Sequence, residues 1–186
     1  MMRVMTSSVL ACIKAMGLLI MAGLVGCASP ARIAEMSVQQ PVAQTATSPF
    51  QRSIAVMEVT GGRETNPMWS SQVSSDSFQR ALEISLQNLN LSDPVKSANR
   101  YHLTADILEV SQPMLGLDIT VTTVVRYSLV NATSRKEIFS KVINAAYTAK
   151  MSDALVGTER MRLANEGAAR ANIKLLTDEL LRQPAP

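Results

Sequence analysis

The fold is decided by the stretch Ile119-Thr120-Val121-Thr122-Thr123-Val124-Val125-Arg126-Tyr127-Ser128-Leu129-Val130. Most of these residues are β-branched or aromatic, types that strands favour, so the stretch predicts one long strand. Because side chains alternate between the two faces of a strand, one face is apolar and consists of Ile119, Val121, Val125, Tyr127 and Leu129. A polar turn over 131–136 and a second strand signal over 137–148 follow, which together predict a β-hairpin.

Two further strands and two helices surround this hairpin. Strand signals lie over 53–59 and 101–110, and a helical pattern over 71–89 places Phe78, Leu82, Leu86 and Leu89 on one apolar stripe. A long helix begins after Gly157 and ends near Leu181. The side of this helix that we expect to face the sheet carries Met161, Ala164, Ala168, Ala171, Leu175 and Leu180. Its charged residues are expected on a solvated face, with a partner surface as the alternative: Arg160, Arg162, Glu166, Arg170 and Lys174.

The order of these elements is strand, helix, strand, strand, strand, helix. A helix between the first two strands favours a right-handed parallel crossover, and the short connections that follow favour an antiparallel meander. We therefore predict an α+β fold, a two-layer sandwich in which two helices cover one face of a four-stranded mixed sheet. Residues 53–183 are long enough to form it as a single domain.

The N-terminal region has the features of an export signal. Arg3 and Lys14 supply positive charge, and an apolar core over 15–25 ends in Leu24-Val25-Gly26-Cys27. This core is too short to remain as a helix across a bilayer of roughly 30 Å. The last four residues resemble the lipobox of bacterial lipoproteins. The alternative is a buried Cys27 in an ordinary apolar helix.

The lipobox resemblance implies a lipid anchor. Residues 1–26 would be a signal peptide, the thiol of Cys27 would take a diacylglycerol, and its freed amine would take a fatty acid such as palmitate. Several acyl chains hold a protein on a membrane that it does not span. Ala28, where an aspartate would signal inner-membrane retention, implies the periplasmic face of the cell outer membrane. Residues 27–52 contain Pro30, Pro41 and Pro49 and are predicted to be a flexible tether, although how much of it docks on the domain stays open.

Composition excludes several classes of function. Residues 1–26 hold two of the 18 Lys and Arg residues and none of the 15 Asp and Glu residues, so the remaining chain is nearly neutral. Nucleic acid binding usually requires a basic face, and we predict none. With Cys12 removed and Cys27 acylated, no thiol remains, and the single His102 cannot assemble a zinc site. We therefore predict no metal and no cofactor.

Candidate catalytic residues are few. The chain has no Gly-x-Ser-x-Gly motif, and Gly61-Gly62 lacks the Lys and Ser or Thr of a phosphate-binding loop, which favours a simple turn there. His102 and Asp106 share one face of a predicted strand and could pair as a general base, although a solvent-facing role is favoured. We predict that the protein is not an enzyme and has no catalytic residues.

Two apolar features define a candidate partner surface, formed by Trp69, Met114, Leu115 and Leu117. Trp69 follows Asn66-Pro67 at a predicted helix start, where it either covers one end of the core or faces a partner. The other three residues lie in a predicted loop over 111–118. Loops run over the surface, so apolar residues there indicate contact with lipid or a partner, unless they fold back over the sheet end.

The chain resembles a group of small proteobacterial lipoproteins without a settled activity. The resemblance rests on Glu58-Val59-Thr60-Gly61-Gly62, Glu64-Thr65-Asn66-Pro67-Met68-Trp69, Gly116-Leu117-Asp118, and the stretch from Arg160 to Ile173. In architecture it also resembles lipoproteins of lipopolysaccharide assembly and auxiliary lipoproteins of ABC transport. These resemblances imply a non-enzymatic accessory in envelope assembly or transport that binds a protein or lipid partner. The alternatives are a structural or secretion-system lipoprotein that oligomerises through sheet edges, and a hydrolase or acyltransferase.

Overall fold

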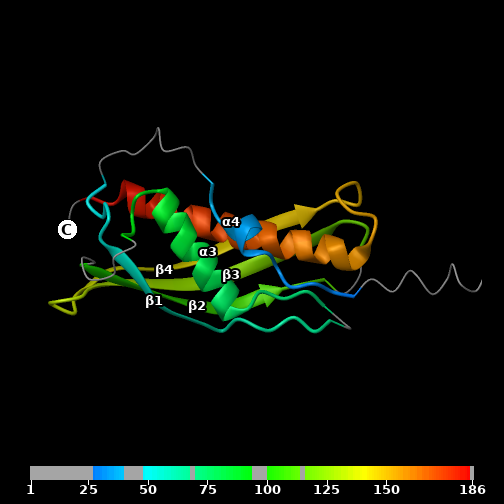
Figure 1. The fold of residues 1–186 in the computed structure, drawn as a ribbon, viewed down its shortest axis with the longest axis horizontal. Helices are drawn as coiled ribbons and strands as arrows, with labels where there is room; N and C mark the ends of the chain where they lie inside the picture. The colour runs from blue at the N-terminus through cyan, green and yellow to red at the C-terminus, as the bar shows by residue number, and fades with distance from the viewer. Residues whose placement is uncertain (1–26, 40–47, 68–69, 94–99, 114–115, 185–186) are drawn as a thin grey trace, which may run out of the picture.

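The computed structural model describes residues 27–39, 48–67, 70–93, 100–113 and 116–184. Its elements, in order, are α2 (Ile33–Met36), β1 (Ile54–Thr60), α3 (Ser75–Asn88), β2 (Tyr101–Ser111), β3 (Ile119–Asn131), β4 (Glu137–Ala149) and α4 (Gly157–Arg182). The strands form one sheet in the order β1-β2-β3-β4, in which β1 is parallel to β2 and the other neighbours are antiparallel. Helices α3 and α4 both cover one face of this sheet (Figure 1). The predicted α+β sandwich is confirmed.

The two faces of the sheet differ as the alternation in β3 predicts. The apolar face of β3, from Ile119 to Leu129, is buried under the helices. On the opposite face Thr120 and Arg126 are exposed, and no described residue covers them with a second layer. The hairpin pairs β3 with β4 along nearly their whole length, from Ile119 opposite Ala149 to Val130 opposite Glu137.

Helix α3 starts later than the sequence predicts. Ser74 caps it, because its Oγ accepts a hydrogen bond from the backbone N of Ser77 at 3.2 Å. Residues 71–74 therefore lie outside the helix. The predicted apolar stripe of α3 is confirmed, since Phe78, Leu82 and Leu86 are all buried.

Helix α4 corrects one expectation. Ala164, Ala168 and Leu180 are buried as predicted, but Leu175 is exposed. Three residues expected on the solvated face are buried, namely Arg160, Arg162 and Glu166. The prediction of a solvated face is therefore wrong for these three. The turn before α4 supplies carbonyl partners for Arg160, and Arg162 pairs with two carboxylates of α4 itself, those of Glu159 and Glu166. Glu166 has a further partner in Arg32, which belongs to a third layer of chain over this side of α4.

That layer is the N-terminal segment, residues 28–38, which the sequence placed in a tether of undecided docking. Its apolar residues Ala28, Ala31, Met36 and Val38 are buried. The backbone N of Val38 donates to Ser85 Oγ on α3 at 2.9 Å, and Arg170 on α4 donates to the carbonyl of Glu35 at 2.6 Å. The segment thus packs over both helices.

A polar network lies inside the core between β3, β4 and α4. The hydroxyl of Tyr127 donates to Asn172 Oδ1 at 2.8 Å. The Nδ2 of Asn172 donates to the carbonyls of Thr123 at 3.1 Å and Ile143 at 3.0 Å. Burial raises the pKa of the Tyr127 phenol well above its ordinary value, so Tyr127 stays neutral and acts as a donor.

Candidate functional site

Several connections meet at one end of the sheet, which we call the loop end. It comprises the described residues of 27–32, 61–73, 112–118 and 150–156. They meet there because β1, β2 and β4 finish at this end, while β3 and α4 begin at it. In Figure 1 the loop end is on the right, opposite the C-terminus.

A polar network joins the loop after β1 to the loop after β2. Ser70 Oγ donates to Gln112 Oε1 at 3.1 Å, and Gln112 Nε2 donates to Asn165 Oδ1 on α4 at 2.7 Å. Asn165 Nδ2 donates to the carbonyl of Ser71 at 2.8 Å, and its side chain is fully buried. The two loops are therefore fixed to each other and to the first half of α4.

Only part of the candidate partner surface can be placed. Trp69, Met114 and Leu115 lie outside the described residues. Leu117 is 71% exposed. The hydrogen bond between Ser70 and Gln112 shows that the two loops that carry the predicted surface lie side by side, which the sequence does not reveal. The predicted role of these residues stays a prediction.

Cys27 lies at this same end and is exposed. The next residue, Ala28, is buried, and its backbone N donates to the carbonyl of Pro67 at 2.8 Å. Pro67 belongs to the loop after β1. The chain is thus attached to the domain immediately after Cys27.

The turn between β4 and α4 adds exposed apolar residues that the sequence analysis missed. Leu155 is 84% exposed, Val156 50% and Met151 45%. The same signal that singles out Leu117, a large apolar residue in a predicted connection, was present in Leu155-Val156-Gly157. The pairing of the turn with the loop after β2 could not be read from the sequence.

Three sets of hydrogen bonds hold this turn in place. Asp153 Oδ2 accepts from the backbone N of Lys150 at 2.8 Å, and Asp118 Oδ1 accepts from that of Met151 at 2.9 Å. The guanidinium of buried Arg160 donates to the carbonyls of Ala154 at 2.6 Å and Leu155 at 2.9 Å. These bonds explain why Arg160 is buried, and they fix the backbone that presents Leu155.

An ionic cluster fixes the N-terminal segment to α4. Glu166 accepts hydrogen bonds from the backbone N of Arg32 at 2.9 Å, from Arg32 Nε at 3.0 Å and from Arg162 Nη1 at 2.9 Å. Arg162 also pairs with Glu159. The hydrogen bond to Glu166 raises the pKa of the Arg32 guanidinium above its ordinary value. The cluster holds the chain five residues after Cys27.

The hypothetical pair of His102 and Asp106 is not formed. Asp106 instead accepts a hydrogen bond from Thr60 at 3.0 Å and lies 3.5 Å from Arg126. Four residues of strand separate the two side chains by roughly 13 Å, at about 3.3 Å per residue. Asp106 is therefore not a hydrogen-bond partner that could make His102 a general base.

Gly61 and Gly62 have a packing role. Gly61 has φ of 80° and approaches β2 so closely that a Cβ would collide with the carbonyl of Ile107. A Cβ on Gly62 would collide with the backbone of Ser75 at the start of α3. The interpretation of this pair as a turn agrees with the structure.

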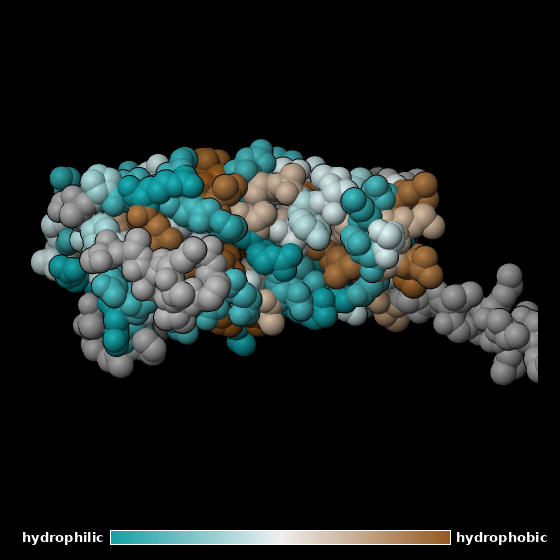
Figure 2. All heavy atoms as spheres, turned by 90° about the horizontal axis from the view of Figure 1, so that it is seen from above, coloured by the Kyte–Doolittle hydropathy of each residue, from teal (hydrophilic) through white to brown (hydrophobic). Residues whose placement is uncertain are grey.

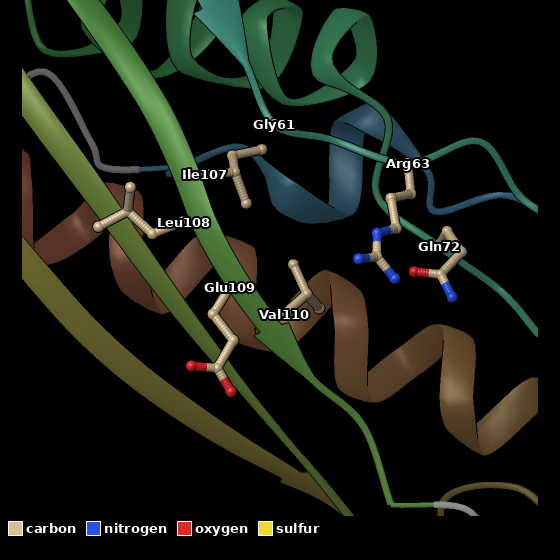
Figure 3. Close-up of a pocket in the computed structure, with 7 residues that line it drawn as sticks. All are labelled: Gly61, Arg63, Gln72, Ile107, Leu108, Glu109 and Val110. Carbon is tan, nitrogen blue, oxygen red and sulfur yellow. The ribbon is translucent and has the colours of Figure 1, made fainter.

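A small pocket lies beside this turn, lined by Gly61, Arg63, Gln72, Ile107, Leu108, Glu109 and Val110. Figure 3 shows Arg63 and Gln72 side by side, with the carboxylate of Glu109 pointing away from them. The volume of the pocket is about 120 Å³. Sites for drug-sized ligands have roughly 300–1,000 Å³, so this pocket is smaller than such a site.

The described part of the chain contains neither a candidate metal site nor a helix that could span a membrane. No group of His, Cys, Asp and Glu residues there is arranged to hold a metal ion. No helix within the same residues has the length and apolar character needed to cross a membrane.

Comparisons with known proteins identify the fold. No family model matches the sequence, and no curated protein matches it significantly. A Caulobacter crescentus protein described as a candidate lipoprotein has 16% identity and a TM-score of 0.52, over 73% of this chain and 96% of that one. A Xanthomonas campestris protein of the family DUF330 has 12% identity and a TM-score of 0.54, over 77% of this chain and 90% of that one. At these identities the matches show a shared fold only.

Proposed function

We propose that the protein is a bacterial lipoprotein, anchored through acyl groups on Cys27 to the periplasmic face of the outer membrane. The observation that carries the proposal is the position of Cys27, which ends the stretch that resembles a lipobox, is exposed and precedes a segment that packs on the domain. An ordinary apolar helix would be expected to bury this cysteine. The fold shared with proteins described as lipoproteins supports the same proposal.

We propose a non-enzymatic accessory role in envelope assembly or transport, exerted by binding a protein or lipid partner. In its support, Asp106 is engaged by Thr60 and Arg126 and does not form the pair with His102 that the sequence allows. The exposed Leu117 and the turn at Leu155 offer binding surface instead. Large exposed apolar side chains gathered at one end of a domain are typical of interaction sites.

Oligomerisation through a sheet edge has less support. The outer edge strand β4 carries Lys141, which pairs with Glu179 at 2.8 Å. Charged lysines on edge strands are a common protection against edge-to-edge pairing. We therefore do not propose assembly through this edge.

Cys27→Ser should abolish acylation of the protein. Serine lacks the thiol that takes the diacylglycerol, so the chain should no longer incorporate labelled palmitate or fractionate with outer membranes. Cys12→Ser is the matched control and should keep both properties, because Cys12 lies in the predicted signal peptide. Labelling that persists in Cys27→Ser, or that is lost in Cys12→Ser, would contradict the proposed anchor.

Leu117→Ser should weaken the envelope function without unfolding the domain. Because Leu117 is 71% exposed, its replacement removes binding surface and little core packing. Cells that depend on the variant should resemble cells lacking the protein in their sensitivity to large antibiotics, while the purified variant should melt at the wild-type temperature. The control is Leu175→Ser on the exposed side of α4. Full complementation by Leu117→Ser would exclude this residue from the functional surface.

A further inference from the structure

We infer that the loop end of the domain rests on the membrane that carries the anchor, with Leu155, Val156 and Leu117 in contact with lipid. The occupant of this apolar surface is thus the bilayer itself. The inference rests on the proposed function, because it takes Cys27 as the acylated residue. It adds an orientation and a set of lipid-contacting residues that the anchor alone does not define.

The first argument is that the anchor has no slack. Consecutive Cα atoms lie about 3.8 Å apart, so Cys27 stays within about 4 Å of Ala28. Ala28 is buried and bonded to the carbonyl of Pro67 in the loop after β1. Acyl chains on Cys27 enter the bilayer, and they therefore draw the loop end to the membrane surface. A flexible tether would have left the orientation of the domain free.

The second argument is the apolar character of this end. Leu155 and Leu117 are 84% and 71% exposed, the highest values among the large apolar residues of the described chain. The two connections that carry them are joined by the bond from the backbone N of Met151 to Asp118. Figure 2 shows hydrophobic surface at the right-hand end of the described body, where the turn between β4 and α4 lies in Figure 1.

The third argument is that the turn is built to keep Leu155 outward. The buried guanidinium of Arg160 donates hydrogen bonds to the carbonyls of Ala154 and Leu155, so the backbone of the turn is held from its buried side. A loop that merely lacked core contacts would not need a buried guanidinium to hold it. These bonds hold the backbone at Leu155, and its side chain is 84% exposed, so it is available to enter the outer part of a bilayer, about 5–10 Å deep.

Charge complementarity contributes little to this contact. Lys150 and Arg63 are exposed at the loop end, but the nearby carboxylates of Asp118 and Asp153 are also there, each engaged by a backbone N–H. No cluster of basic residues faces the membrane from the described connections at this end. We therefore expect the contact to depend on apolar insertion and to be insensitive to salt and to the fraction of anionic lipid.

Fluorophores on single cysteines in the full-length, acylated protein test the inference. The mature chain has no other free thiol once Cys12 is removed and Cys27 is acylated, so Leu155→Cys or Val156→Cys can be labelled alone with an environment-sensitive dye. The proteins are reconstituted in vesicles of phosphatidylethanolamine and phosphatidylglycerol that contain a lipid with a nitroxide near its headgroup. The matched control is Val142→Cys on the open face of the sheet, because Val142 and Val156 are both 50% exposed.

The expected result is severalfold stronger nitroxide quenching at positions 155 and 156 than at 142, with a blue-shifted emission that persists at high salt. Leu155→Glu, introduced beside a dye at Leu117→Cys, should reduce the quenching at position 117. Acylated protein with equal quenching at 155 and 142 would overturn the inference and leave the proposed anchor standing. Intact mass without acyl groups on Cys27 would overturn the anchor and the inference together.

Discussion

Replacing Glu166 with alanine should destabilise the protein by about 3 kcal/mol, because it breaks a buried ionic cluster. Glu166 is 2% exposed and accepts bonds from the backbone and guanidinium of Arg32 and from Arg162. Its loss leaves the largely buried Arg162 with Glu159 as its remaining carboxylate partner. Since Glu159 remains and Arg32 is half-exposed, we expect the lower end of the range for broken buried pairs.

The same substitution should loosen the N-terminal segment before it unfolds the sheet. Amide exchange in residues 28–38 should become faster, since the bonds of Arg32 to Glu166 hold this segment to α4. Urea unfolding measures the free energy of unfolding of the domain, and hydrogen exchange measures how fast the amides of residues 28–38 exchange. Asp178→Ala on α4 is the control, because its pair with Lys174 is partly exposed and should contribute less than about 1 kcal/mol. Equal losses in the two variants would show that Glu166 has no special role.

Replacing Asn172 with alanine should also destabilise the domain by about 2–4 kcal/mol, because it removes the centre of a fully buried hydrogen-bond network. Asn172 is the acceptor for the hydroxyl of Tyr127 and the donor to the carbonyls of Thr123 and Ile143. Without its amide these buried groups lose their hydrogen-bond partners. The pKa of Tyr127 is raised, so the phenol stays neutral near neutral pH and cannot compensate by ionising.

Urea unfolding of Asn172→Ala checks this expectation, with Asn144→Ala as the matched control. Asn144 lies on the open face of β4 and is exposed, so its replacement should change the free energy of unfolding by less than about 0.5 kcal/mol. Tyr127→Phe removes one donor of the same network and should fall between the two variants. If the Asn172→Ala variant is as stable as the wild-type protein, the hydrogen-bond network makes no net contribution to the free energy of unfolding.

Both substitutions act on α4, the helix that connects the core of the domain to the N-terminal segment. Asn172 bonds the second half of α4 to the sheet, while Glu166 bonds its first half to the N-terminal segment. If the proposed anchor is correct, Glu166→Ala would give the domain slack between Cys27 and its body. The lipid contact at Leu155 should then weaken even in protein that is still folded.

The sequence by itself determined the sheet and its covering helices. The alternation in β3 from Ile119 to Leu129 and the stripe of Phe78, Leu82 and Leu86 in α3 are local periodic patterns. Such patterns indicate which face of an element is buried. The order of the elements and their short connections then leave few possible topologies for the sheet. The start of α3 was missed by four residues because the cap at Ser74 competes with earlier serines.

Only the tertiary structure decided what happens to charges and connections. Arg160, Arg162 and Glu166 have the spacing of a solvated helix face, yet all three are buried. The turn before α4 supplies partners for Arg160, and the N-terminal segment supplies Arg32 as a partner for Glu166, which in turn pairs with Arg162. Leu117 and Leu155 are 38 residues apart in the sequence, and they reach the same end of the domain because β3 begins where β4 finishes. Periodicity reports the environment of one element at a time, whereas the partner of a buried charge and the neighbours of a loop depend on contacts between distant parts of the chain.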